Sequence, residues 1–395
     1  MLHKPDARDQ TVAAPARIAA LDRARTLITL LVVLHHAVIN YSYFGNGDRM
    51  RWLGFDLVVL FNDSFFMACM FFISGWFVSG SLTRWGPAIY LRRRAWRLGV
   101  PFLVSIFVVI PIAYYPSFVR YHTAETTDFN FFHFWWHTIT IGPWPSGAAW
   151  FLWVLLTLDA IAALLWAAAH RAIGALGQFI DTLRDRPMTA FAAFLAFTIV
   201  IYLPMRLVFG DSAWLVPGHY PLPIQTSRIL LYAGYFLAGV GVGEAGLSAG
   251  LLAENGALAR RWMVWLAFAL ASYGVILLLV YAHHNWISNF ESPPLWWHTA
   301  YGLAFATFSA AMTFTVPAVF LRFARSSFRL LDAMQPQAYG IYLLHFIPLI
   351  WLQYAVYDPA FPAFVKFAIV FAGTLSISWA LTVLLRKIPV VARTI

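Results

Sequence analysis

A histidine pair inside an apolar segment is the first candidate for chemistry in this sequence. His36 follows Arg25 with ten residues between them, and His35 precedes it directly. Ionisable side chains are costly within hydrocarbon, so each of them is a functional hypothesis. An imidazole exchanges its proton near neutral pH, which suits a general base for a hydroxyl. A histidine held only by an interhelical hydrogen bond is the competing interpretation, and the sequence does not separate the two.

Three more ionisable residues stand in apolar segments. His345 lies eight residues into a late segment, at a depth comparable to that of His36, whereas Asp63 and Asp159 lie in earlier segments. A carboxylate beside an imidazole orients the ring and stabilises its protonated form. No spacing shows that either aspartate reaches His36. For Asp159 a structural polar contact is the favoured interpretation.

A cluster of arginines forms a second candidate site, at the start of an apolar segment. Four of six consecutive positions are arginines, namely Arg92, Arg93, Arg94 and Arg97. Guanidinium groups make charge-assisted hydrogen bonds to phosphates, so the cluster suits a nucleotide-like ligand. Ordinary anchoring at a membrane surface explains two or three of the four. No histidine or cysteine spacing is typical of a metal site, and none is predicted.

The composition requires membrane-spanning helices to position these groups. The chain has 395 residues, of which 61% are hydrophobic and 11% charged, and the mean hydropathy is +0.70. These values exclude an ordinary soluble domain, a disordered chain and a disulfide scaffold. We predict an all-α polytopic membrane protein with about ten spans. The spans are predicted at residues 26–45, 55–80, 98–118, 148–169, 188–209, 228–248, 262–282, 296–321, 337–357 and 361–385.

The distribution of basic residues predicts the orientation. Of the 27 lysines and arginines, 21 fall on the side that holds the N-terminus. Cytoplasmic loops carry this excess, so both termini are predicted to be cytoplasmic. The net charge of +10 then reflects the inner loops, and no nucleic-acid partner is expected. Residues 1–20 are predicted to be a disordered cytoplasmic tail, and residues 21–395 a single membrane domain.

Five segments stand out in order along the chain. They are Leu21-Asp-Arg-Ala-Arg25 with His36 after ten residues, Phe71-Phe-Ile-Ser-Gly75, Arg92-Arg-Arg-Ala-Trp-Arg97-Leu-Gly-Val-Pro101-Phe, Trp150-Phe-Leu-Trp153 and Tyr339-Gly-Ile-Tyr-Leu-Leu-His345. In this order they resemble the acyltransferase-3 family of integral membrane acyltransferases, and the resemblance covers about residues 21–385.

The resemblance implies a membrane enzyme that moves a short acyl group, acetyl or succinyl, from cytoplasmic acyl-coenzyme A to a hydroxyl on the outer side. The acceptor would be a glycan or another extracytoplasmic molecule. The family's first-helix histidine falls on His36, its arginine on Arg25, and its basic motif on Arg93, Arg94 and Arg97. The sequence looks most like glucan succinyltransferases and sugar O-acetyltransferases, which implies a bacterial inner membrane.

Several roles stay open at this stage. His36 would either deprotonate the acceptor hydroxyl or carry the acyl group itself, with His345 and Asp63 as further catalytic candidates. The Ser74 hydroxyl or a buried arginine is the candidate donor to the carbonyl oxygen. A proton-coupled transporter that uses the same histidines and aspartate is one alternative function, and an inactive membrane receptor is another. The acyl group, the acceptor and the oligomeric state are not predicted.

Overall fold

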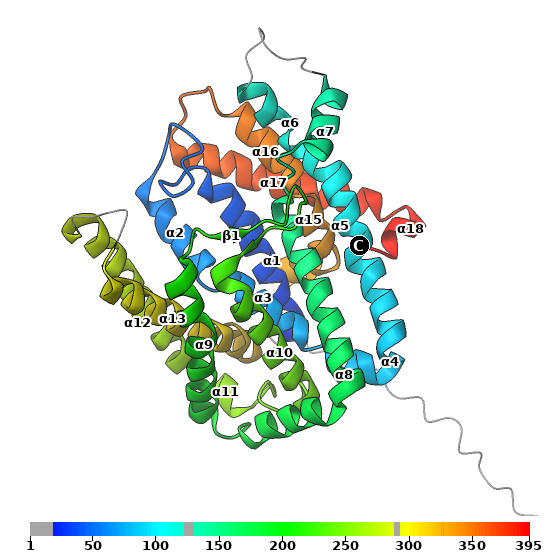
Figure 1. Cartoon of the computed structure of the whole chain (residues 1–395), viewed down its shortest axis with the longest axis vertical. Coiled ribbons are helices and arrows are strands. Elements are labelled where there is room, and N and C mark those ends of the chain that lie inside the picture. Colours follow the sequence, from blue (N-terminus) through cyan, green and yellow to red (C-terminus); the bar gives the residue numbers. More distant parts are fainter. Residues whose placement is uncertain (1–18, 122–129, 288–292, 325, 327) are drawn as a thin grey trace, which may run out of the picture.

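The chain folds into a bundle of helices with one short hairpin (Figure 1). The computed structural model describes residues 19–121, 130–287, 293–324, 326 and 328–395, so most of the predicted tail, residues 1–20, lies outside the described residues. Strands β1 (Trp214–Leu215) and β2 (Ile224–Gln225) pair antiparallel. The helices are α1 (Ala19–Ile39), α2 (Leu53–Asp63), α3 (Phe66–Gly75), α4 (Val78–Arg94), α5 (Val100–Val104), α6 (Ile110–Tyr121), α7 (Phe131–Thr140), α8 (Trp150–Thr182), α9 (Pro187–Phe209), α10 (Ile229–Ala245), α11 (Ala257–Arg260), α12 (Trp262–Trp286), α13 (Leu295–Phe323), α14 (Arg329–Met334), α15 (Ala338–Leu344), α16 (Phe346–Ala355), α17 (Ala363–Leu385) and α18 (Pro389–Ala392).

Seven helical segments in the described part of the chain are long and apolar enough to cross a membrane. They are Leu53–Gly75, Val78–Arg120, Gly147–Thr182, Pro187–Phe209, Trp262–Trp286, Leu295–Phe323 and Ala363–Leu385. An eighth candidate is the pair Arg329–Leu344 and Phe346–Ala355, which bends by 64°. The prediction of an all-α polytopic membrane protein is therefore confirmed.

The two other predicted spans are helical but do not meet the same test of length and composition. Helix α10 has 17 residues, and α1 carries Asp22, Arg23 and Arg25 near its beginning. The total of ten crossings and the cytoplasmic placement of the termini therefore stay predictions.

Helix α1 lies at the centre of the bundle, in contact with α2, α3, α13, α15 and α17 (Figure 1). It begins at Ala19 and ends at Ile39, several residues earlier at both ends than the predicted span 26–45. It ends there because the Ser42 hydroxyl and backbone N–H both donate to the Ile39 carbonyl, and a turn follows. A helix enclosed on so many sides places its polar side chains inside the protein, away from lipid.

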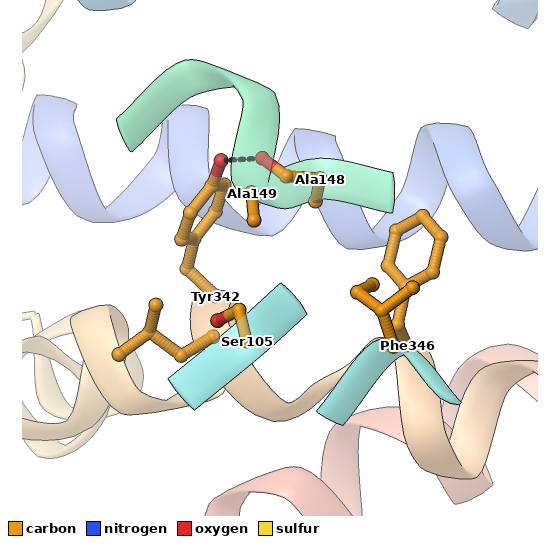
Figure 2. Close-up of a pocket in the computed structure, with 7 residues that line it drawn as sticks. Ser105, Ala148, Ala149, Tyr342 and Phe346 are labelled. Carbon is orange, nitrogen blue, oxygen red and sulfur yellow. Dashed lines mark hydrogen bonds between the residues drawn. The ribbon is translucent and has the colours of Figure 1, made fainter. Parts of the chain in front are cut away.

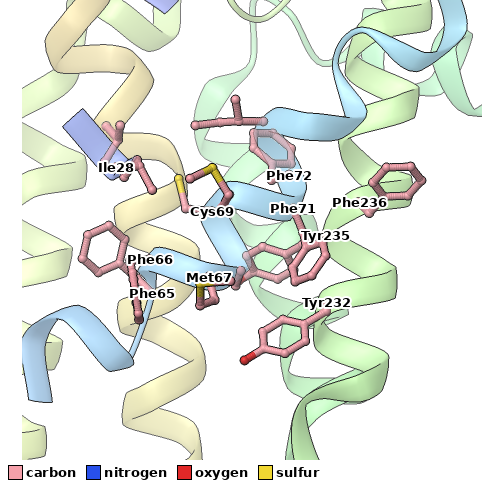
Figure 3. Close-up of a cluster of buried hydrophobic side chains, with 14 of the residues drawn as sticks. Ile28, Phe65, Phe66, Met67, Cys69, Phe71, Phe72, Tyr232, Tyr235 and Phe236 are labelled. Atoms are coloured by element: carbon pink, nitrogen blue, oxygen red, sulfur yellow. The ribbon is translucent and has the colours of Figure 1, made fainter. Parts of the chain in front are cut away.

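Small residues bring α3 and α10 into close contact, next to the aromatic cluster in Figure 3. A Cβ atom on Gly239 would lie 2.1 Å from the Phe72 carbonyl oxygen, and one on Gly243 would lie 2.2 Å from that of Trp76. Close backbone approach at small residues is a main source of helix association in membranes. The Gly239-x-Gly241-x-Gly243 segment is thus a helix-packing element, as its apolar context indicates.

Prolines shape the long segment that runs from α4 to α6. Pro101, Pro111 and Pro116 cannot donate to the carbonyl four residues before each of them. Two π-helical turns, Ala95–Gly99 and Ser105–Val109, directly precede α5 and α6. Aromatic side chains from other elements donate to these three carbonyls instead. The pairs are Tyr339 to Arg97, Trp135 Nε1 to Phe107 at 2.8 Å, and Trp351 Nε1 to Ile112 at 2.9 Å.

We predict that Gly239→Ala lowers the stability of the bundle, since the new methyl group overlaps the α3 backbone. The expected loss is about 1–3 kcal/mol, seen as a lower melting temperature in detergent. Gly274→Ala in α12 is the matched control, because no atom lies within 4 Å of its new Cβ. There the helix propensity of alanine leads us to expect an unchanged or higher melting temperature. Equal effects at both glycines would contradict the close-packing role.

Candidate functional site

The structure brings His36 and His345 together at the centre of the bundle. Their rings stack with centroids 5.5 Å apart, and the Phe346 ring packs edge-on against both, at 4.9 Å and 5.0 Å. His345 lies at the bend between α15 and α16, and this bend points its ring toward α1. Two residues far apart in the sequence, both singled out by their position in apolar segments, thus form one site.

Hydrogen bonding fixes the tautomer of His345. Its Nδ1 lies 2.7 Å from the Tyr342 carbonyl oxygen, which can only accept, so Nδ1 carries the ring proton. Nε2 then keeps its lone pair. That atom is buried and has no hydrogen-bond partner among the described residues. Buried polar atoms normally have hydrogen-bond partners. An unpaired acceptor on the ring next to His36 therefore indicates a chemical role for this nitrogen.

His35 faces a different part of the bundle from His36. Its ring packs against Phe66 of α3, with centroids 5.0 Å apart, and its Nδ1 is buried with no partner among the described residues. His36 is half-buried, whereas His35 is buried. Successive helical residues point about 100° apart, which explains why only His36 meets His345.

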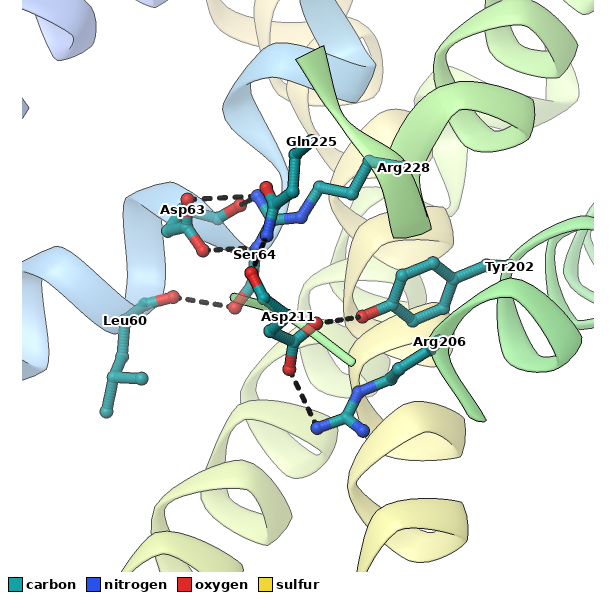
Figure 4. A network of polar contacts seen from close by, with 8 residues as sticks. All are labelled: Leu60, Asp63, Ser64, Tyr202, Arg206, Asp211, Gln225 and Arg228. Carbon is teal, nitrogen blue, oxygen red and sulfur yellow. Dashed lines mark hydrogen bonds and ion pairs between the residues drawn. The ribbon is translucent and has the colours of Figure 1, made fainter. Parts of the chain in front are cut away.

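Asp63, a candidate to orient the imidazole, is held by an arginine (Figure 4). Arg228 donates to both carboxylate oxygens, at 2.9 Å and 2.5 Å, and to the Asp63 carbonyl. Both residues are within electrostatic reach of His35. No hydrogen bond joins Asp63 to His36 in the part of the chain that the structure describes. Asp63 therefore lies beside the histidine site, paired in a fork that suits guanidinium and carboxylate.

The ion pair is part of a larger network at the base of the hairpin. Asp211 accepts from Arg206 at 2.8 Å and from the Tyr202 hydroxyl at 3.3 Å, and the Gln225 side chain donates to its carbonyl (Figure 4). Arg206 and Arg228, which are not singled out from the sequence, are both buried. The signal for them was their position at the edges of apolar segments.

At the other end of the bundle, the predicted basic motif divides into two kinds of arginine. Arg94 forms an ion pair with Asp159 at 3.2 Å and also donates to the Tyr90 hydroxyl at 3.2 Å. The Asp159 side chain is 0% exposed, which agrees with its interpretation as a structural contact. Arg93 and Arg97 are exposed, and the Arg93 guanidinium lies 4.1 Å from the Trp85 ring centre. These two remain accessible to a ligand.

Two further candidates lie on α1 and α3. The Arg25 side chain is 45% exposed and lies 3.6 Å from Asp22, whereas its neighbour Arg23 is buried against Asp332. The Ser74 hydroxyl donates to the Met70 carbonyl at 2.8 Å, within its own helix. Among the described residues, no group of three or more histidines, cysteines or acidic residues could hold a metal ion.

The fold and the site define an integral membrane protein with buried imidazoles between two polar ends. A comparison with protein families matches residues 18–383 to the acyltransferase domain family. The match covers most of the chain, so this protein belongs to the acyltransferase 3 family and is a membrane acyltransferase. A search of the curated proteins finds no match to the chain.

We predict that Asp159→Ala destabilises the protein, because it leaves the Arg94 charge in a largely buried place without its carboxylate. The expected cost is about 3 kcal/mol, measured as a shift in the denaturation midpoint in detergent. The double variant Arg94→Met with Asp159→Leu removes both charges and is expected to recover most of the stability. A double variant as unstable as Asp159→Ala would contradict this account.

Proposed function

We propose that this acyltransferase moves a short acyl group from acyl-coenzyme A to a hydroxyl of an extracytoplasmic acceptor, with His36 activating the hydroxyl. The stacked pair of His36 and His345 carries the proposal. The pair brings together two imidazoles inside a membrane acyltransferase, both from segments that carry the resemblance to the family. A glycan is the acceptor class that the resemblance implies, and a bacterial inner membrane is the proposed location.

The proposed transfer step needs only His36 as a proton carrier. The acceptor oxygen attacks the thioester carbonyl carbon while its proton passes to His36. The new carbon–oxygen bond forms, the carbon–sulfur bond breaks, and the proton returns to the thiolate to give free coenzyme A. Two charged imidazoles in contact repel each other, so His345 stays neutral while His36 holds the proton. A covalent acyl-His36 intermediate remains the other route.

The exposed arginines support a donor that enters from one end of the bundle. Arg25 and His36 lie on the same helix, and their offset of eleven positions corresponds to about 16 Å. Arg93 and Arg97 are exposed near that end as well. Phosphates of coenzyme A bound there would leave its long flexible arm to carry the thioester toward His36. Arg94 is already paired with Asp159, so it would hold the motif in place rather than offer a charge to the phosphates.

The polar network around Asp63 supports an acceptor that arrives from the opposite end. The Arg228–Asp63 pair acts electrostatically on His35, and the contacts of Asp211 lie next to this pair at the base of the hairpin (Figure 4). Polar groups at this depth are expected where water or a hydroxyl compound must enter. The competing transporter would use the same groups for proton movement. Membership in an acyltransferase family favours the enzyme.

We predict that His36→Ala lowers the release of free coenzyme A by about 10²–10⁴-fold, since the transfer loses its base. The assay uses purified protein in lipid, acyl-coenzyme A and envelope glycans, with a thiol-reactive dye as readout. His35→Ala is the matched control, because it removes an adjacent imidazole that does not contact His345. An equal loss in both variants, with both folded by melting temperature, would exclude a specific role for His36.

The same preparation distinguishes the two routes. Without acceptor, an acyl-His36 route predicts a burst of free coenzyme A equal to the amount of enzyme, followed by arrest. A general-base route predicts no burst, because the hydroxyl is absent. Flux of substrate along a proton gradient without any thiol release would support the transporter instead.

A further inference from the structure

The hairpin of residues 211–225 has one buried strand and one exposed strand. Ile224 and Gln225 of β2 are buried, whereas Trp214 and Leu215 of β1 are exposed. The register pairs Trp214 with Gln225 and Leu215 with Ile224. The second strand therefore packs against the protein, and the first strand forms an outer layer.

The exposed part of the hairpin is rich in large apolar side chains. All residues from 214 to 220 are exposed. Trp214, Leu215, Val216 and Tyr220 each keep more than half of their surface exposed. Apolar side chains that stand singly on a surface need no explanation, but a group of them on one short element is typical of an interaction surface.

Charged contacts hold the base of the hairpin near the histidines of α1. Asp211, the first residue of the hairpin, forms an ion pair with Arg206 at 2.8 Å. Three positions after β2, Arg228 pairs with Asp63 at 2.5 Å, and this pair acts electrostatically on His35. The base of the hairpin is therefore fixed on the side of the histidine site that the Asp63 network occupies.

The tip of the hairpin meets the connection between α7 and α8. A Cβ on Gly142 in this connection would lie 3.8 Å from His219 Nδ1. Farther along the connection, the Ala148 carbonyl accepts from the Tyr342 hydroxyl, and Tyr342 lies three positions before His345 (Figure 2). The tip therefore lies next to a segment that is hydrogen-bonded to α15, the helix that ends directly before His345.

The two attachments place the hairpin beside the histidine site. Tryptophan and tyrosine in membrane proteins usually form a belt where the protein faces the lipid headgroups. The rings of this hairpin stand instead on an element whose base and tip both contact segments around the histidines. A tryptophan or tyrosine ring offers a flat apolar face. Sugar rings match such a surface, because they have apolar C–H faces and a rim of hydroxyls for the polar groups of Asp211 and His219.

We propose that Trp214 and Tyr220 bind the sugar rings of an oligosaccharide acceptor while one hydroxyl of that acceptor reaches His36. The inference rests on the proposed function, and it adds the element that holds the acceptor and the length that the acceptor needs. The two rings stand on the exposed layer of the hairpin, whereas His36 contacts His345 within the bundle. A molecule in contact with both is larger than a single sugar.

The first test compares acceptors of two lengths in the assay of coenzyme A release. Envelope glycans are used whole and after acid hydrolysis to monosaccharides. With whole glycans, Trp214→Ala and Tyr220→Ala are each expected to raise KM by about tenfold and to change kcat by less than about twofold, since they remove binding and leave the base in place. Trp214→Phe keeps a flat ring and is expected to keep KM near the wild-type value. The monosaccharides are expected to be poor acceptors, with equal activity in the wild type and Trp214→Ala.

Trp286→Ala is the matched control. Trp286 ends α12, is also exposed and stands outside the hairpin, so its removal is expected to leave KM unchanged. An equal rise in KM for Trp214→Ala and Trp286→Ala would overturn the proposal. So would an unchanged KM in both hairpin variants, or equal use of whole and hydrolysed glycans by the wild type.

A labelling experiment tests the hairpin without turnover. The chain has a single cysteine, Cys69, which is buried, so Val216→Cys supplies one accessible thiol. In nanodiscs of phosphatidylethanolamine and phosphatidylglycerol, we expect a water-soluble maleimide to label this thiol and saturating whole glycans to abolish the labelling. Labelling that whole glycans leave unchanged would overturn the proposal. Quenching of a fluorophore on the same thiol by spin-labelled lipids would also overturn it, because the hairpin would then lie in the membrane surface.

The two experiments distinguish this inference from the proposed function. Protection of the Val216→Cys thiol by glycans, without release of coenzyme A in the assay, would support the hairpin site and overturn the proposed function. Release that depends on His36, with an unchanged KM in Trp214→Ala and Tyr220→Ala, would overturn the hairpin site alone.

Discussion

A charge within a membrane-spanning bundle needs an opposite charge beside it, and this constraint fixes how the helices meet. Arg94 holds Asp159 between α4 and α8, and Arg228 holds Asp63 at the end of α2. Lys366 of α17 lies 3.0 Å from both carboxylate oxygens of Asp48 and donates to the Tyr357 carbonyl as well. Each pair joins segments that are distant in the sequence. Removing one partner would leave the other charge in a place where hydration cannot replace it.

The histidines at the centre are polar groups of another kind. His345 Nε2 and His35 Nδ1 are buried and have no hydrogen-bond partner in the described part of the chain. Neutral imidazoles tolerate this where a charged group would not, because their desolvation costs much less. A site for proton transfer needs such an acceptor, available and away from bulk water. The charged residues nearby are paired, whereas these imidazole nitrogens are not.

The sequence predicted what depends on local composition and left out what depends on distant contacts. His36 and His345 were found because ionisable residues stand out in apolar segments. The partners of Asp63 and Asp159 could not be assigned, since Arg228 and Arg94 reach them across 165 and 65 positions of the chain. The end of α1 at Ile39 depends on a turn stabilised by Ser42, which hydropathy does not show.

Backbone irregularity and the position of the histidine pair are connected in this fold. An unbroken helix in place of α15 and α16 would carry His345 past α1, whereas the 64° bend turns it toward His36. The π-helical turn at Ser105–Val109 precedes Pro111 and opens space beside the same bend. Phe346 lines that space and packs against both imidazoles. The breaks in the helices are therefore also the features that bring the two imidazoles together.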